Sequence, residues 1–211
     1  MPAAHCHKIS IQTLKQYWEE CPRDDDLMQA QLARIVTELD HAQARLDRLA
    51  DSVPEDRWAK RSDPSRWSVA ECVAHLNLTS EAYIPRIRKA IEEARKIPPA
   101  GNRKYRRDPV GLFFGTMVGP LPSIAGFRIG RVKTMPAFVP SGDHPKQLLL
   151  AEFRRLQMEL TRMVKECDGL AIDKVTIVSP FGEKVRYNCY SAFVLLPRHQ
   201  ERHIQQGELV W

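Results

Sequence analysis

Pro197-Arg198-His199-Gln200-Glu201-Arg202-His203-Ile204-Gln205-Gln206 is the stretch of sequence around which the rest of the chain can be interpreted. Two histidines stand four residues apart in it. On an α-helix this spacing places both side chains on one face, one turn apart, with about 5–6 Å between their Cβ atoms. Two imidazoles in that arrangement are able to hold one metal ion.

A third histidine lies in another segment that we expect to be helical. His75 follows a segment in which Ser68 and Glu71 have the spacing of a capping box, a signature of a helix start. We hypothesise that His75, His199 and His203 meet across a helical bundle and bind a divalent metal. Three protein ligands would leave one coordination position open for water or substrate.

Length and composition indicate one ordinary globular domain. The chain has 211 residues, of which 43% are hydrophobic and 27% charged. No run approaches the roughly 20 apolar residues that cross a bilayer, and the N-terminus lacks the apolar core of a secretion signal. We therefore expect a cytoplasmic protein with no membrane partner. The five cysteines are scattered without a CxxC pair, which argues against a zinc ribbon or a disulfide framework.

The net charge of +6 is mildly basic, and much of the excess lies in Arg103-Lys104-Tyr105-Arg106-Arg107. Such a cluster could bind nucleic acid, together with residues 128–133, but no recognition motif accompanies it. A solvated basic loop is the more frequent explanation, so we do not expect a nucleic-acid partner.

Periodic apolar residues divide the chain into helices. We expect residues 1–21 to form an N-terminal arm and residues 22–211 one domain. Apolar residues recur at steps of three and four, which is typical of helices with one buried stripe. The predicted helices run from near Asp24–Asp26 to Pro54, from Ser68 to before Pro98, from Asp143 to Gly169, and from about Tyr187 to Gln206. The fold class is therefore all-α, a four-helix bundle.

The connection between the second and third helices, residues 98–142, is the least regular part. Its prolines exclude a long helix, although a short helix near 110–118 is expected. A connection of this length is often functional, and it could roof a pocket or cover a partner subunit. The β-branched segment 174–179 is interpreted as an extended connection rather than a sheet strand.

Several motifs in order resemble the DinB-like superfamily, in its YfiT-type branch. These are Trp67-Ser-Val-Ala-Glu71, Ala74-His75-Leu76, Pro180-Phe181-Gly182, and Pro197-x-His199-x-x-Arg202-His203-x-x-Gln206. The resemblance covers residues 22–206. It implies an up-down-down-up bundle, a metal held by His75, His199 and His203, and a homodimer. Characterised relatives include thiol-dependent transferases that use bacillithiol or mycothiol.

Two departures from the family pattern are visible. The 98–142 connection is longer and richer in proline than the resemblance implies. Ergothioneine-forming sulfoxide synthases carry HxxxHxE in a related bundle, whereas this chain has Gln205 at the last position, and we expect no large partner domain. We therefore do not expect that activity.

The chemistry of a three-histidine site leaves two reactions open. Neutral imidazoles leave the metal's charge uncompensated, so a bound water or thiol is acidified. The expectation is a metal-dependent thiol S-transferase or hydrolase acting on a small molecule, with a low-molecular-weight thiol as a second cofactor. Zinc is the default metal, with nickel, iron or manganese as alternatives. Glu71 and Glu201 are weak candidates for a catalytic base. The alternative is a non-catalytic dimeric bundle, a binding or stress-response protein with a structural metal or none.

Overall fold

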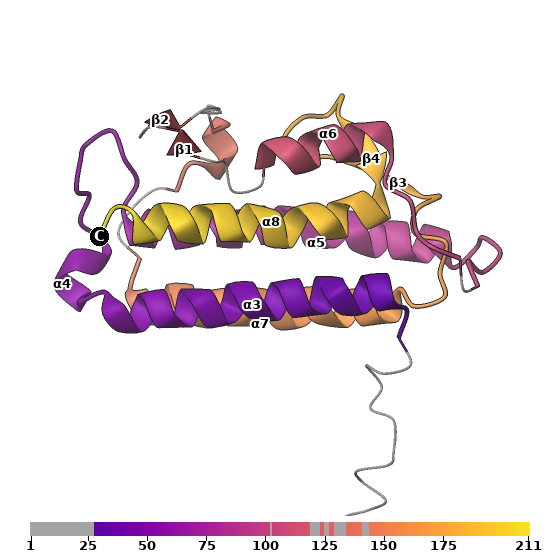
Figure 1. The fold of residues 1–211 in the computed structure, drawn as a ribbon, viewed down its shortest axis with the longest axis horizontal. Coiled ribbons are helices and arrows are strands. Elements are labelled where there is room, and N and C mark those ends of the chain that lie inside the picture. Colours follow the sequence, from indigo (N-terminus) through magenta and orange to yellow (C-terminus); the bar gives the residue numbers. More distant parts are fainter. Residues whose placement is uncertain (1–27, 102, 119–122, 125–126, 129–133, 141–143) are drawn as a thin grey trace, which may run out of the picture.

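The computed structural model describes residues 28–101, 103–118, 123–124, 127–128, 134–140 and 144–211 (Figure 1). The predicted N-terminal arm, the acidic residues 24–26 and the predicted cap Asp143 lie outside these described residues. No helix of the described chain is both long enough and apolar enough to cross a membrane.

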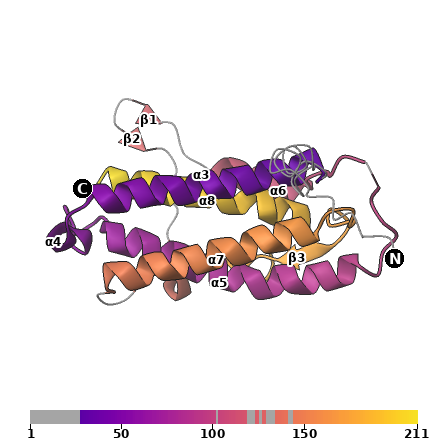
Figure 2. The same cartoon turned by 90° about the horizontal axis from the view of Figure 1, so that it is seen from below.

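Four long helices make up most of the described chain. They are α3 (Ala30–Ser52), α5 (Val69–Ala94), α7 (Lys146–Glu166) and α8 (Cys189–Glu208). Helices α5 and α8 lie side by side above α3 and α7 in Figure 1, and each layer packs on the other. Helices α3 and α8 run in one direction, and α5 and α7 run in the opposite one (Figures 1 and 2). The all-α expectation is thus confirmed as a mostly helical fold.

The predicted apolar stripes face the core. On α3 the buried residues recur at the predicted steps of three and four, and the last turn ends just before Pro54, as predicted. The start of α5 is the predicted capping box. The Ser68 hydroxyl accepts a hydrogen bond from the Glu71 amide at 3.2 Å, and the Glu71 carboxylate accepts one from the Ser68 amide at 2.8 Å. Both bonds satisfy amides that a helix leaves unpaired at its N-terminus.

The start of α7 differs from the sequence-based expectation. The helix begins at Lys146 after Pro145, whose side chain makes no capping hydrogen bond. The Lys146 ammonium instead donates to the backbone oxygens of Ala50 and Val53, at 2.6 and 2.8 Å. A cation beside the last carbonyls of α3 also complements that helix's dipole. The same ammonium lies 5.1 Å from the ring of Trp58, in a short helix, α4 (Glu55–Trp58), that the sequence patterns did not predict.

The described structure also contains two small antiparallel hairpins. Strand β3 (Thr176–Val178) pairs antiparallel with β4 (Arg186–Asn188), with Ile177 opposite Tyr187. The extended connection predicted over residues 174–179 is therefore wrong, and Tyr187 belongs to a strand rather than to the last helix. Residues 176–178 form a strand because they pair with β4, about ten residues later in the chain. The second hairpin joins β1 (Ser123–Ile124) to β2 (Phe127–Arg128).

The connection before α7 contains the predicted short helix, α6 (Pro109–Val118), and a 3-10 turn, η1 (Pro136–Phe138). Helix α6 packs on α8 (Figure 1). The Asp108 carboxylate fixes this contact, because it accepts hydrogen bonds from the Asn188 amide, the Ser191 hydroxyl and the Gly111 amide. A Cβ at Gly111 would lie 2.1 Å from the Ser191 hydroxyl oxygen. A glycine is therefore required where the two helices approach.

Candidate metal centre

The three predicted histidines come together between α5 and α8. His75 lies in the second turn of α5, whereas His199 and His203 lie one turn apart in the C-terminal half of α8. Because the two helices run in opposite directions, the start of α5 lies beside the end of α8. Each histidine offers one ring nitrogen such that these three atoms lie within 4.8 Å of one another. Among the described residues, these three side chains are the group that is able to hold a metal ion.

The geometry of the cluster suits imidazole ligands. The Nε2 atoms of His75 and His199 are 3.4 Å apart. Two nitrogens that each lie about 2.0–2.1 Å from a tetrahedral metal are separated by about 3.3 Å. The ring of His203 is 4.4 Å from that of His75 and 4.6 Å from that of His199, centroid to centroid. The pair in α8 thus adopts the one-face arrangement that its spacing predicts.

His75 is oriented by the connection that precedes α7. Its Nδ1 lies 2.8 Å from the backbone oxygen of Phe138 in η1. A carbonyl oxygen only accepts, so Nδ1 carries the proton and Nε2 presents its lone pair to the other histidines. A hydrogen bond of this kind fixes the tautomer and the orientation of a metal-binding histidine. The Nδ1 atoms of His199 and His203 are buried and have no hydrogen-bond partner among the described residues.

The site holds all three imidazoles in the neutral form that binds metal. Burial lowers the pKa of His75, and the hydrogen bond to Phe138 offsets part of this effect. Burial, the neighbouring His75 and the positive charge of Arg202 lower the pKa of His199 to about 3. The same causes, together with His199, hold the pKa of His203 well below its ordinary value, although the Gln206 side chain opposes them. A protonated imidazole has no lone pair to give, so these shifts favour metal binding.

Aromatic rings enclose the histidines. The ring of Trp67, which precedes the capping box of α5, lies 4.9 Å from the ring of His75 and 5.9 Å from that of His203. The Phe181 ring, in the turn of the β3–β4 hairpin, lies 5.9 Å from the ring of His199. These two residues belong to the motifs that carried the family resemblance, and the structure places both against the histidines.

The two carboxylates named as weak catalytic candidates take part in ion pairs. Glu71 caps α5 and binds the Arg61 guanidinium through both oxygens. Glu201 pairs with Arg45 of α3. Arginine holds the pKa of Glu71 below its ordinary value, although burial opposes this effect. Both carboxylates are thus engaged by arginines from other segments of the chain.

A small cavity beside His199 contains residues that the sequence patterns did not single out. It has a volume of about 20 Å³, enough for one water molecule. Its polar lining includes Tyr83 of α5, Tyr187 of β4 and Ser179, and the two tyrosine hydroxyls hydrogen-bond to each other. Burial raises the pKa of both tyrosines, so both stay protonated. No local spacing links these residues, because the β3–β4 pairing brings Ser179 near Tyr187 and the packing of this hairpin on α5 brings both near Tyr83.

Comparison with known proteins identifies the family. A family model described as the DinB superfamily matches residues 38–206, well over half of the chain. This range includes all three histidines and all four long helices except the ends of α3 and α8. No curated protein and no solved structure matches the chain. The chain belongs to the DinB superfamily.

Proposed function

We propose that this protein is a metal-dependent enzyme in which His75, His199 and His203 hold one divalent transition metal. The observation that carries the proposal is the convergence of three neutral imidazoles from two helices, with His75 and His203 buried and His199 partly buried. Enclosing three polar rings in one cluster is costly unless their polar atoms are satisfied. The Nε2 atoms of His75 and His199 lie 3.4 Å apart, and a metal between the rings would use lone pairs that otherwise meet only each other.

The reaction we propose is a thiol S-transfer or a hydrolysis on a small-molecule substrate. A bound metal supplies Lewis acidity, which makes a thiol or water a better nucleophile at neutral pH. Zinc is the default for imidazole ligands, with nickel, iron and manganese as alternatives. The protein keeps the imidazoles neutral, orients His75 through the Phe138 carbonyl and surrounds the rings with Trp67 and Phe181. The Tyr83 and Tyr187 hydroxyls share one hydrogen bond, so one of their two protons would remain for a water or substrate group in the cavity beside His199.

Further features of the family belong to the same proposal. The four long helices would form the family's up-down-down-up four-helix bundle, and two copies would associate as a homodimer. Helix α6 offers an apolar surface for this association, because Val110 and Phe113 are 40% and 60% exposed. Exposed apolar residues that gather on one element often mark a contact with another chain.

The same exposed surface favours a second candidate, a non-catalytic dimeric bundle with a structural metal or none. The cavity beside His199 is no larger than a water molecule, and the two nearby carboxylates are held in ion pairs. A binding or stress-response protein would need no substrate cavity. The two candidates differ in one measurable respect, which is whether turnover depends on the metal.

Elemental analysis of the untagged protein tests the metal site. The wild type is expected to contain about one transition metal per chain, and His203→Ala is expected to lose it while the circular dichroism spectrum stays helical. His41→Ala is the matched control, because His41 lies exposed on α3 and its loss leaves the site intact. No metal in the wild type, even after reconstitution with zinc, nickel, iron and manganese, would refute the enzyme proposal.

If the metal is present, a screen of thiol cofactors with electrophilic substrates separates the two candidates. Turnover that His203→Ala abolishes and His41→Ala retains supports the enzyme. A stoichiometric metal whose removal lowers the melting temperature, with no turnover of any thiol or ester tested, favours the structural-metal candidate.

A further inference from the structure

A second and much larger cleft lies on the side of α6 that faces α3. It has a volume of about 500 Å³ and is lined by α3, α6, α8 and residues 105–107. This size is within the range of small-molecule sites. None of the three histidines is among the described residues that line it. The cleft is therefore a separate feature from the candidate metal centre.

The charged side chains around this cleft are four arginines and one glutamate. The glutamate, Glu38, pairs with Arg34 at 3.0 Å. In the described part of the chain, Arg106, Arg107 and Arg198 make no ion pair with a carboxylate. Asp108, next to Arg107 in the chain, already accepts hydrogen bonds from α6, α8 and the residue before α8. Glu201, the acid nearest to Arg198 in the chain, pairs with Arg45.

Two of these arginines are close enough to repel each other. Burial lowers the pKa of Arg107, and the positive charge of Arg198 lowers it further. The Arg107 guanidinium also packs tightly on α6, because its Nη1 lies 2.8 Å from where a Cβ of Gly115 would be. Like charges held together at the wall of a cleft cost stability, and an anion bound between them removes that cost.

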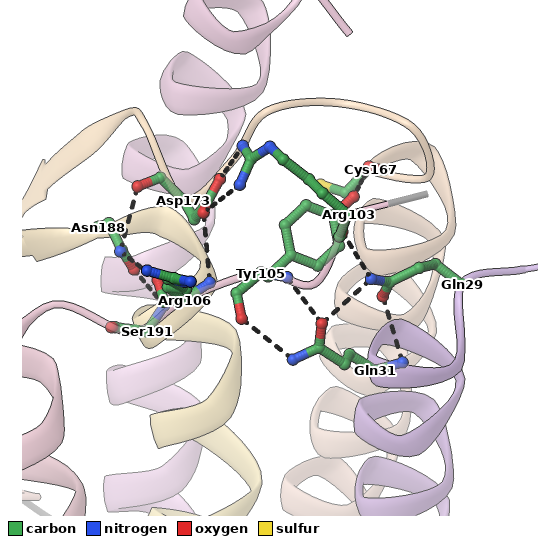
Figure 3. Close-up of polar contacts among 9 residues, drawn as sticks. All are labelled: Gln29, Gln31, Arg103, Tyr105, Arg106, Cys167, Asp173, Asn188 and Ser191. Carbon is green, nitrogen blue, oxygen red and sulfur yellow. Dashed lines mark hydrogen bonds and ion pairs between the residues drawn. The ribbon is translucent and has the colours of Figure 1, made fainter. Parts of the chain in front are cut away.

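Arg103, another basic residue of the 103–107 cluster, is used differently. Figure 3 shows Arg103 binding the Asp173 carboxylate through two nitrogens, at 2.7 and 2.5 Å. The Asp173 side chain is only 2% exposed. The sequence cluster 103–107 is thus divided: Arg103 makes a structural ion pair, whereas Arg106 and Arg107 line the cleft.

The floor of the cleft is held by polar contacts. The Gln31 side-chain amide donates a hydrogen bond to the Tyr105 backbone oxygen and accepts one from the Tyr105 backbone N–H (Figure 3). It also donates to the Tyr190 hydroxyl at 3.0 Å. The two tyrosine rings stack 5.2 Å apart. Tyr105 is thereby fixed to α3 and α8, so the backbone that carries Arg106 and Arg107 is held in place before any ligand arrives.

We propose that this cleft binds a small organic anion. Its phosphate or carboxylate group lies between Arg107 and Arg198, with Arg106 nearby, and its apolar part lies against Leu112 and Val194. The guanidinium group presents paired N–H donors that match either oxyanion. The apolar residues of the lining distinguish an organic anion from an inorganic one.

Binding of two simple probes tests the proposal. Phenyl phosphate and benzene-1,3-dicarboxylate are titrated into the full chain by calorimetry at constant ionic strength, with benzyl alcohol as the neutral comparison. At least one anion is expected to bind saturably, and benzyl alcohol is not. Tighter binding of phenyl phosphate would identify phosphate as the preferred group, and tighter binding of the dicarboxylate would identify carboxylate. Arg107→Gln/Arg198→Gln is expected to bind it at least about tenfold more weakly, since two charge-assisted contacts are lost.

The controls separate this site from general charge effects and from the metal centre. Arg48→Gln/Arg162→Gln removes the same charge from exposed positions on α3 and α7 and is expected to bind within about twofold of the wild type. His203→Ala is expected to bind the anion unchanged. Should the double variant fail to fold, Arg198→Gln alone serves, because it removes one of two repelling charges. No saturation by either anion at millimolar concentration, equal weakening in the control pair, or loss of binding in His203→Ala would overturn the proposal.

Discussion

Replacement of Asp108 by alanine tests whether one carboxylate holds α6 in place. Helix α6 contributes Phe114 and Val118 to the cavity beside His199. It also contributes Leu112 to the larger cleft that Arg107 and Arg198 line. Its attachment to α8 therefore affects both sites. Asp108 accepts three hydrogen bonds, from the Asn188 amide at 2.8 Å, the Ser191 hydroxyl at 2.9 Å and the Gly111 amide at 3.0 Å.

The cost of the substitution follows from these contacts. A hydrogen bond to a charged group contributes about 1.5–3 kcal/mol to stability. Asp108 is only partly buried, so water replaces some of the lost bonds. We therefore expect Asp108→Ala to lower the free energy of unfolding by about 2–4 kcal/mol in total. Asp108→Asn keeps one acceptor oxygen without the charge and is expected to cost about half as much.

The effect depends on pH in a definite direction. Burial alone would raise the pKa of Asp108, but the hydrogen bonds from Asn188, Gly111 and Ser191 outweigh it and hold the pKa below its ordinary value of 3.8. The unfolded chain therefore binds the proton first as the pH falls. The carboxylate's contribution is fully present above about pH 4 and is lost as the pH falls through the lower folded pKa. The gap between wild type and Asp108→Ala is expected to shrink in that window.

Urea unfolding followed by circular dichroism measures these differences between pH 7 and pH 3. Asp40→Ala, on the exposed face of α3, is the matched control and is expected to change stability by less than about 0.5 kcal/mol. If Asp108→Ala costs no more than Asp40→Ala, or if the gap does not depend on pH, the junction is not held by this carboxylate.

Three other substitutions test contacts of the two sites. Trp67→Ala is expected to weaken metal binding about tenfold in a chelator competition, because the ring no longer supports two histidines; unchanged affinity would contradict this. Gly111→Ala is expected to lower the unfolding free energy by about 1–3 kcal/mol in a urea titration, since its Cβ would meet Ser191. Tyr187→Phe removes one hydrogen-bond partner of the buried Tyr83 hydroxyl and is expected to cost about 1–3 kcal/mol by thermal unfolding. A variant as stable as wild type would show that another group satisfies that hydroxyl.

The pattern of apolar residues was enough to predict the long helices. The stripes on α3 and α7 and the capping box of α5 are local features, because a helix brings together residues three and four positions apart. The spacing of His199 and His203 placed both rings on one face for the same reason. The short helix near 110–118 was also visible in the sequence. The β3 strand was missed because its pairing with β4 is not encoded in its own few residues.

The tertiary structure decided what each polar residue does. Glu71 and Glu201 looked available in the sequence, yet Arg61 and Arg45, from other segments, engage them. The basic run 103–107 looked uniform in the sequence. In the structure Arg103 pairs with the buried Asp173 side chain, whereas Arg106 and Arg107 line a cleft.

His75 meets the other two histidines because α5 and α8 run antiparallel, and its tautomer depends on a carbonyl from the connection before α7. Local spacing sets which residues share a helix face. Only the packing of distant segments sets which charges are neutralised, which rings are buried and which side chains share a site.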